Sequence, residues 1–255
     1  MPAARTRSAD RKDRAEVDWR PRQNPASCPY RSSEFSCMGT DGKRPVTCII
    51  FAMSFSALIA EAVRGVEYEF RPGELAYLAL TAKIEQPVRD RLAFLLHEKS
   101  QNGSVMVARE WENVDIAILI GGVPRVLLEL KAAYTFDILK NGKPHSCFNE
   151  VANDVRKRFL RQYEAVEIYT LLLASHPHQL PNSTFQEGIA YYSNLQAQFN
   201  RLADAEQAYE CSRERADEIM KNHPVQVSGR LRGGVAFGVE VSVSYWLSGP
   251  YHEMV

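Results

Sequence analysis

Two short apolar runs on either side of a glycine-containing turn constrain the fold of this chain more than any other feature. The runs cover residues 114–120 and 126–133, and the sequence Gly-Gly-Val-Pro at 121–124 separates them. A break of this kind between runs rich in β-branched residues is typical of a β-hairpin. The sequence therefore predicts two antiparallel strands here, and the rest of the chain is arranged around them.

Three charged residues interrupt these apolar strands: Asp115, Glu129 and Lys131. Side chains alternate across a strand, so Glu129 and Lys131 share one face, and the hairpin brings Asp115 beside Glu129. Because isolated buried charges are costly, this group calls for a cation, a substrate or a partner. Two carboxylates can hold Mg²⁺, which can activate water at a phosphodiester, and a lysine can orient that water. Alternatively, Glu129 and Lys131 are solvated on an exposed strand and Asp115 belongs to a turn.

The spacing of these charges resembles the motif of the PD-(D/E)XK nuclease superfamily, which has the restriction-endonuclease-like fold. Asp115 is followed, after thirteen residues, by Glu129, Leu130 and Lys131. The Pro that usually precedes the Asp is Val114 here. The resemblance implies an α/β fold with an αβββαβ core and a mixed sheet. It also implies a metal-dependent nuclease that hydrolyses phosphodiester bonds of nucleic acid, with DNA as the expected substrate.

The resemblance further implies that the helix before the hairpin supplies another metal-binding glutamate. Residues 72–99 have helical periodicity, and Pro87 indicates either a kink or a second helix with Pro87 in its first turn. We choose Glu85 for this role, with Glu74 as the second candidate; either residue can instead lie on a solvated helix face. The metal-binding set for Mg²⁺ or Mn²⁺ is then Glu85, Asp115 and Glu129, and the catalytic set is Asp115, Glu129 and Lys131.

The surrounding sequence provides the other elements of such a core, which extends over residues 72–177. The expected elements after the first helix are a strand at 103–111, the hairpin, a helix at 149–165 and a buried strand at 166–175. His176 and His178 are expected in the loop after that strand, without the partners that a zinc site needs.

Residues 178–255 are expected to add elements to the core. These are a long helix over 194–222, a Gly/Arg-rich turn over 228–234 and a C-terminal strand over 235–247. Such a strand, placed at the edge of the core sheet, would serve either a homodimer contact or nucleic-acid binding.

Formal net charge is zero, so a nucleic-acid surface must be a local basic patch. The best candidate in the folded part is the cluster Arg156, Lys157, Arg158 and Arg161 on the predicted helix, where contacts to phosphate position a duplex without reading its sequence. The alternative is a solvated helix face, balanced by the acidic residues of the same helix.

Residues 1–52 have no apolar periodicity and are rich in Pro, Ser and Arg, which predicts a disordered basic extension. This segment is either a basic arm, a solvated tail or sequence upstream of a true start at Met53; the nuclease-like domain is expected at 53–255. The apolar run 46–59 is shorter than the ~20 residues that span a bilayer. Five cysteines without metal-ligand spacing favour reduced thiols, so we expect a cytoplasmic protein without a membrane partner.

The main alternative to catalysis is a non-catalytic module that binds nucleic acid or protein and keeps the same fold. Loss of a motif residue would favour it, whereas Asp115, Glu129 and Lys131 are all present.

Overall fold

The computed structural model describes residues 54–100, 104–139, 146–159, 166–201 and 204–251. The chain divides into two units, residues 1–44 and 45–255. The extension expected over residues 1–52 lies outside the described residues, so the structure described below belongs to the second unit.

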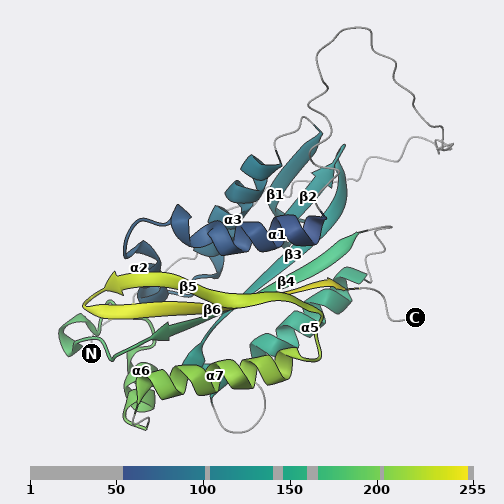
Figure 1. The fold of residues 1–255 in the computed structure, drawn as a ribbon. Helices are drawn as coiled ribbons and strands as arrows, with labels where there is room; N and C mark the ends of the chain where they lie inside the picture. The colour runs from purple at the N-terminus through teal and green to yellow at the C-terminus, as the bar shows by residue number, and fades with distance from the viewer. Residues whose placement is uncertain (1–53, 101–103, 140–145, 160–165, 202–203, 252–255) are drawn as a thin grey trace, which may run out of the picture. The chain divides into compact units, whose positions relative to one another are not determined.

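Six strands of the described residues form one mixed sheet (Figure 1). They are β1 (Val105–Trp111), β2 (Val114–Ile120), β3 (Val123–Tyr134), β4 (Glu167–Pro177), β5 (Val225–Ala236) and β6 (Val239–Tyr251). Their order is β1-β2-β3-β4-β6-β5, and β3 and β4 are parallel whereas the other neighbouring pairs are antiparallel. The expected α/β class with a mixed sheet is confirmed.

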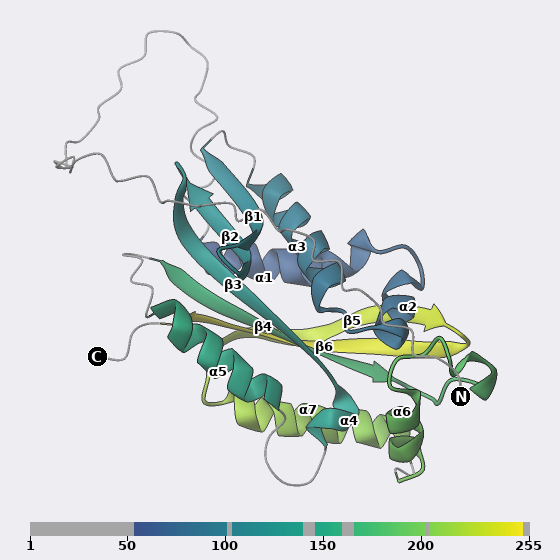
Figure 2. The same cartoon turned by 180° about the vertical axis from the view of Figure 1, so that it is seen from behind.

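Helices cover both faces of this sheet (Figures 1 and 2). They are α1 (Phe55–Gly65), α2 (Glu74–Thr81), α3 (Glu85–Lys99), α4 (Thr135–Ile138), α5 (Ser146–Phe159), α6 (Tyr192–Phe199) and α7 (Ala205–Met220), with short 3-10 turns at Val66–Glu69 and Ser183–Phe185. Helices α1, α2 and α3 pack on one face in the largest apolar cluster, and α5 and α7 pack on the other. Pro87 is the third residue of α3, so the prediction of a second helix with Pro87 in its first turn is confirmed.

The central hairpin forms where the sequence predicts it. Ile120 pairs with Val123, so the loop consists of two residues, Gly121 and Gly122, with φ values of 59° and 81°. Two consecutive positive φ values are typical of the type I′ turn, whose twist matches that of antiparallel strands. Glycine adopts this conformation without a steric penalty, which explains the turn sequence.

Strand β3 separates apolar and charged side chains between the two faces, as the alternation predicts. Leu128, Leu130 and Ala132 point into the cluster under α1, α2 and α3. Glu129 and Lys131 point to the opposite face, where both contact side chains of α5. The charges of the motif therefore lie between the sheet and α5.

Helix α1 begins within the apolar run 46–59, at Phe55. The side chain of Ser54 accepts a hydrogen bond from the Ala57 N–H at 3.3 Å and caps the helix. Ile59, Ala62 and Val63 form its buried stripe. Among the helices that the structure describes, none combines the length and the apolar character that a membrane crossing requires.

The prediction of one long helix over 194–222 is wrong, because the structure has α6 and α7 instead. Asp204 caps α7 by accepting a hydrogen bond from the Glu206 N–H at 2.9 Å. Apolar residues continue through this junction with helical spacing, and no Pro or Gly marks it, so periodicity alone does not reveal the break.

The prediction of a turn over 228–234 is also wrong, because these residues lie in β5. Gly229 pairs with Tyr245 of β6, and a Cβ at Gly229 would lie 2.6 Å from Tyr245 Oη. The glycine therefore makes room for an aromatic ring on the neighbouring strand, rather than forming a turn. The C-terminal strand is likewise not at the sheet edge, since β6 lies between β4 and β5.

His176 is not in a loop but at the end of β4, where only 4% of its surface is exposed. Its Nδ1 lies 2.7 Å from Thr135 Oγ1, and its ring is tilted against Tyr209. Burial, with smaller contributions from the adjacent His178 and Arg230, lowers the pKa of His176 to about 3. The folded protein therefore keeps this imidazole neutral at a pH at which an unfolded chain protonates it.

We predict that acid destabilises the protein through His176. Below about pH 6.5 the unfolded chain binds a proton that the folded chain does not, so the free energy of unfolding falls as the pH drops towards about 3, by up to ~1.4 kcal/mol per pH unit. His176→Asn keeps a polar group beside Thr135 and removes the titration, so urea unfolding at several pH values should give a flatter profile. The exposed His97→Asn serves as the control and should keep the wild-type slope.

Candidate functional site

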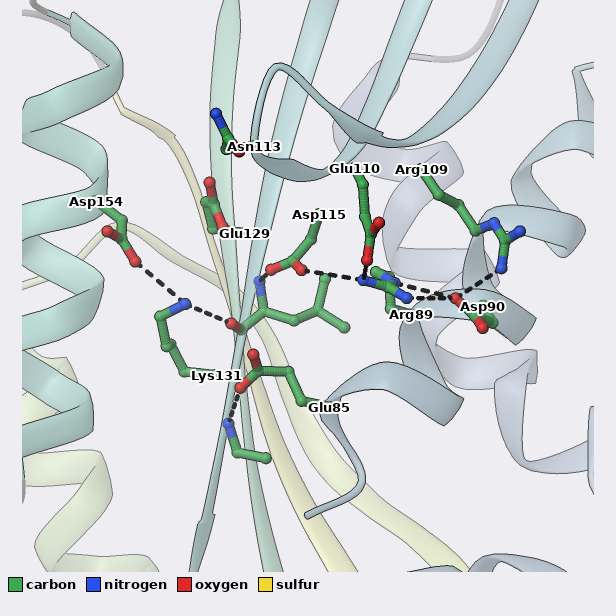
Figure 3. Close-up of polar contacts among 12 residues, drawn as sticks. Glu85, Arg89, Asp90, Arg109, Glu110, Asn113, Asp115, Glu129, Lys131 and Asp154 are labelled. Carbon is green, nitrogen blue, oxygen red and sulfur yellow. Dashed lines mark hydrogen bonds and ion pairs between the residues drawn. The ribbon is translucent and has the colours of Figure 1, made fainter. Parts of the chain in front are cut away.

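The candidate site lies where β2 and β3 separate. The last backbone pair of their ladder at this end is Ile116 with Leu128, while β3 continues beside β4 as far as Tyr134. In a strand, alternate residues direct their N–H groups to opposite sides, so Leu130 has no partner strand on the β2 side. The Asp115 carboxylate takes that place, because its Oδ2 accepts the Leu130 N–H at 2.8 Å (Figure 3).

Glu85, at the first position of α3, performs the same task two residues further along β3. Its Oε2 accepts the Ala132 N–H at 3.0 Å. The second candidate, Glu74, instead accepts the Arg71 N–H and pairs with Arg91 at 3.4 Å. The structure therefore brings Glu85 to the motif strand, whereas the contacts of Glu74 are with Arg71 and Arg91, outside the motif.

Glu129 is the most deeply buried carboxylate of the motif, with 4% of its surface exposed. Its Oε1 accepts hydrogen bonds from Nε of Arg158, at 2.9 Å, and from Nη2 of the same guanidinium. Nη2 also donates to the carbonyl of Asn113 in the turn between β1 and β2, at 2.5 Å. Arg158 therefore links α5 to both β3 and the β1–β2 turn.

This position of Arg158 differs from the expected one. The sequence predicts Arg158 on the exposed side of its helix with Arg156 and Lys157, but only 7% of its surface is exposed. Arg156 and Lys157 are exposed, as expected, and Lys157 contacts Asp154 of its own helix at 3.4 Å. Arg161 lies outside the described residues.

Lys131 lies on the same face as Glu129 and contacts a different residue of α5. Its Nζ lies 3.1 Å from Asp154 Oδ2 and donates to the Leu130 carbonyl at 3.0 Å. Both side chains of the pair retain 17% exposure, so this ion pair is more accessible than the one between Glu129 and Arg158.

A second cluster of charges begins at Arg89 of α3, on the far side of Asp115 (Figure 3). The Arg89 guanidinium is buried and donates to Glu110 at 2.6 Å and to Asp90 at 3.0 Å. Its Nη1 lies 3.9 Å from Asp115 Oδ1, a distance at which it contributes charge but no hydrogen bond. Arg109 closes the cluster by pairing with Asp90 at 2.9 Å.

Burial and crowding of like charge shift the pKa values at the site. Burial raises the pKa of Glu129, Arg158 opposes the shift, and the adjacent Asp115 carboxylate adds to it. Burial also raises the pKa of Glu85; the positive charge of Lys131 opposes this shift, and the negative charge of Asp115 adds to it. For Lys131, burial lowers the pKa, but Glu85 and Asp154 outweigh it and the net pKa is raised. The lysine is therefore a charged donor at neutral pH, whereas burial makes Glu85 and Glu129 easier to protonate than exposed carboxylates.

Family models, curated proteins and solved structures were compared with this chain. None of them matches.

The donor set suits a hard cation in chemical type. Hydrogen bonds to β3 use one oxygen each of Asp115 and Glu85, which leaves the other oxygen of each carboxylate as a ligand for Mg²⁺ or Mn²⁺. Burial is the main cause of the raised pKa values of Glu85 and Glu129, and a bound divalent cation would favour the charged forms of both carboxylates. Within the described residues, no three acidic, His or Cys side chains already converge as a metal-binding group, and Glu129 is bonded to Arg158 instead.

Two residues of the site, Arg89 and Asp154, were missed in the sequence, and Arg158 was predicted on the exposed face of its helix although it is buried. A signal was present for both arginines, because each falls on the apolar stripe of its helix. Arg89 follows Val88 and precedes Leu92 by three positions, and Arg158 follows Val155 by three. A cation on a buried stripe requires a buried anion, and the acidic motif residues are the natural partners.

We predict that Asp115 stabilises the fold separately from any catalytic role. Asp115→Ala leaves the Leu130 N–H without its acceptor and should lower the free energy of unfolding by about 1–3 kcal/mol. Asp115→Asn keeps a side-chain oxygen at the same place and should lose less than about 1 kcal/mol. Urea unfolding of both variants measures the difference.

Glu74→Ala is the matched control, since it removes a carboxylate that also accepts a backbone N–H but remains partly accessible to water. It should cost less than Asp115→Ala. Equal losses for the Ala and Asn variants of Asp115 would contradict the capping role.

Proposed function

We propose that this chain is a metal-dependent nuclease that hydrolyses phosphodiester bonds of nucleic acid, with DNA as the expected substrate. The observation that carries the proposal is that Asp115 of β2 bonds to β3 between Glu129 and Lys131, and that the helix before the hairpin brings Glu85 to the same strand. The order α3, β1, β2, β3, α5 and β4 corresponds to αβββαβ and supports a restriction-endonuclease-like core.

In this proposal each residue has a separate task. Asp115, Glu85 and Glu129 would hold Mg²⁺ or Mn²⁺, which supplies positive charge to the phosphodiester and makes bound water more acidic. Lys131 is already fixed by Asp154 and the Leu130 carbonyl, so its ammonium has a defined direction towards a phosphate oxygen or the attacking water. Because its pKa is raised, Lys131 acts as a donor and not as a base.

Arg156 and Lys157 are the candidates for contact with the nucleic-acid backbone. Both are exposed on α5, the helix whose inner side contacts the motif. Phosphate contacts from this helix would position a strand next to Lys131 without reading its sequence. A homodimer and a cytoplasmic location stay predictions.

One observation favours a second candidate function, a non-catalytic nucleic-acid-binding or protein-interaction module. The Glu129 carboxylate is bonded to Arg158, and Lys131 is paired with Asp154. Such pairs can neutralise the charges of the motif without a metal. A non-catalytic protein could therefore retain these residues for stability alone.

We predict that the purified protein cleaves plasmid or single-stranded DNA in the presence of Mg²⁺ or Mn²⁺, and that EDTA abolishes cleavage. Lys131→Met and Asp115→Asn should each lower the rate by about 100-fold or more, because each removes a group that acts on developing charge. Both variants should remain folded, as judged by circular dichroism.

The outcome separates the two candidates. The binding module would be supported if the wild-type protein does not cleave DNA but still binds single-stranded DNA, and if Lys157→Gln weakens that binding. Cleavage that survives both motif substitutions would show that the motif is not the active site.

A further inference from the structure

Four charged residues at the contact between α5 and β3 form two neighbouring ion pairs, which we call the α5–β3 quartet. Its members are Glu129, Lys131, Asp154 and Arg158. Residues two apart on a strand are ~6.6 Å apart, and residues four apart on a helix are ~6 Å apart along its axis. Helix α5 therefore matches the spacing of β3 and presents the opposite charge to each motif residue.

The two pairs of the quartet differ in their burial and in their bonds. Glu129 and Arg158 are almost fully buried, whereas Lys131 and Asp154 retain partial exposure. Arg158 uses Nε and Nη2 for Glu129 and Nη2 for the Asn113 carbonyl. A guanidinium has five N–H donors, and none of the hydrogen bonds to described residues uses Nη1 of Arg158.

A buried carboxylate such as Glu129 needs a cation, and removing its only cation is strongly destabilising. Among the described residues, Arg158 is the cation that hydrogen-bonds to Glu129. Both hydrogen bonds from Arg158 use Oε1, so a divalent ion held by Glu129 would bind through Oε2 and would repel the adjacent guanidinium at close range. The two cations therefore compete for Glu129, unless another anion receives Arg158.

We propose that Arg158 is the phosphate-binding residue of this site and reaches the phosphate by exchanging Glu129 for it when a divalent cation binds. The inference rests on the proposed function and adds a residue to it. A guanidinium matches the geometry of a phosphate, to which it binds with two parallel hydrogen bonds. The exchange couples the two ligands: without a phosphate Arg158 opposes the metal, and with a phosphate both bind together.

The test measures Mn²⁺ binding by electron paramagnetic resonance, with and without a short phosphorothioate oligonucleotide that resists cleavage. The oligonucleotide should raise the Mn²⁺ affinity of the wild-type protein by about 10-fold. Arg158→Met removes the competing charge and keeps much of the side-chain volume. This variant should bind Mn²⁺ several-fold more tightly than the wild type when alone, and should lose the enhancement by the oligonucleotide.

Arg91→Met is the matched control, because it breaks an arginine–glutamate pair away from the site. Arg91→Met should change neither the Mn²⁺ affinity nor its enhancement by the oligonucleotide. Arg158→Lys retains a cation for Glu129 and guards against misfolding of the Met variant, but it lacks the planar fork. It should give a Mn²⁺ affinity between those of the wild type and Arg158→Met, with a weaker enhancement.

Mn²⁺ affinities that are equal in the wild type and the folded Arg158 variants, or a wild-type affinity that the oligonucleotide leaves unchanged, would overturn the role of Arg158. The nuclease proposal would survive that result if the wild type still binds Mn²⁺ and cleaves DNA. A wild-type protein that binds no Mn²⁺ would overturn both.

Discussion

The need to neutralise Glu129 determines how the helices and strands of this protein meet. A carboxylate with almost no contact with water requires a permanent counter-charge, and Arg158 provides it from α5. The same guanidinium holds the β1–β2 turn through the Asn113 carbonyl. One buried ion pair thus fixes a helix, a strand and a turn relative to one another, and any chemistry at this position has to work within that constraint.

The separation of β2 and β3 gives the acidic residues a structural reason to be where they are. Asp115 and Glu85 replace a missing strand by accepting N–H groups of β3. Backbone groups buried without a partner are costly, so these carboxylates are held in defined orientations before any ligand binds. A structural role and a catalytic role are compatible here, because a carboxylate has two oxygens and the backbone uses one of them.

Much of the core can be predicted from the sequence, and the reasons for the failures are physical. Strand alternation correctly puts Glu129 and Lys131 on one face, and the two glycines correctly mark the turn of the hairpin. Periodicity does not distinguish a continuous helix from two helices when apolar residues keep their spacing across the break, as between α6 and α7. Gly229 of β5 resembles a turn residue because the aromatic ring that fills its space, that of Tyr245, comes from a different strand. Arg158 was assigned to the surface by its charge, although its position on the helix favours the interior.

The position of β6 between β4 and β5 has a consequence for how the protein is made. The strands β1, β2, β3 and β4 leave the ribosome in the order in which they lie in the sheet, but β4 gains its second neighbour only from the last strand described. Until then one edge of a strongly apolar strand is open, which is a template for pairing with another chain. Nascent chains therefore pass through an interval in which association with other chains on the same mRNA competes with folding. The number of residues between β4 and β6 sets the length of that interval.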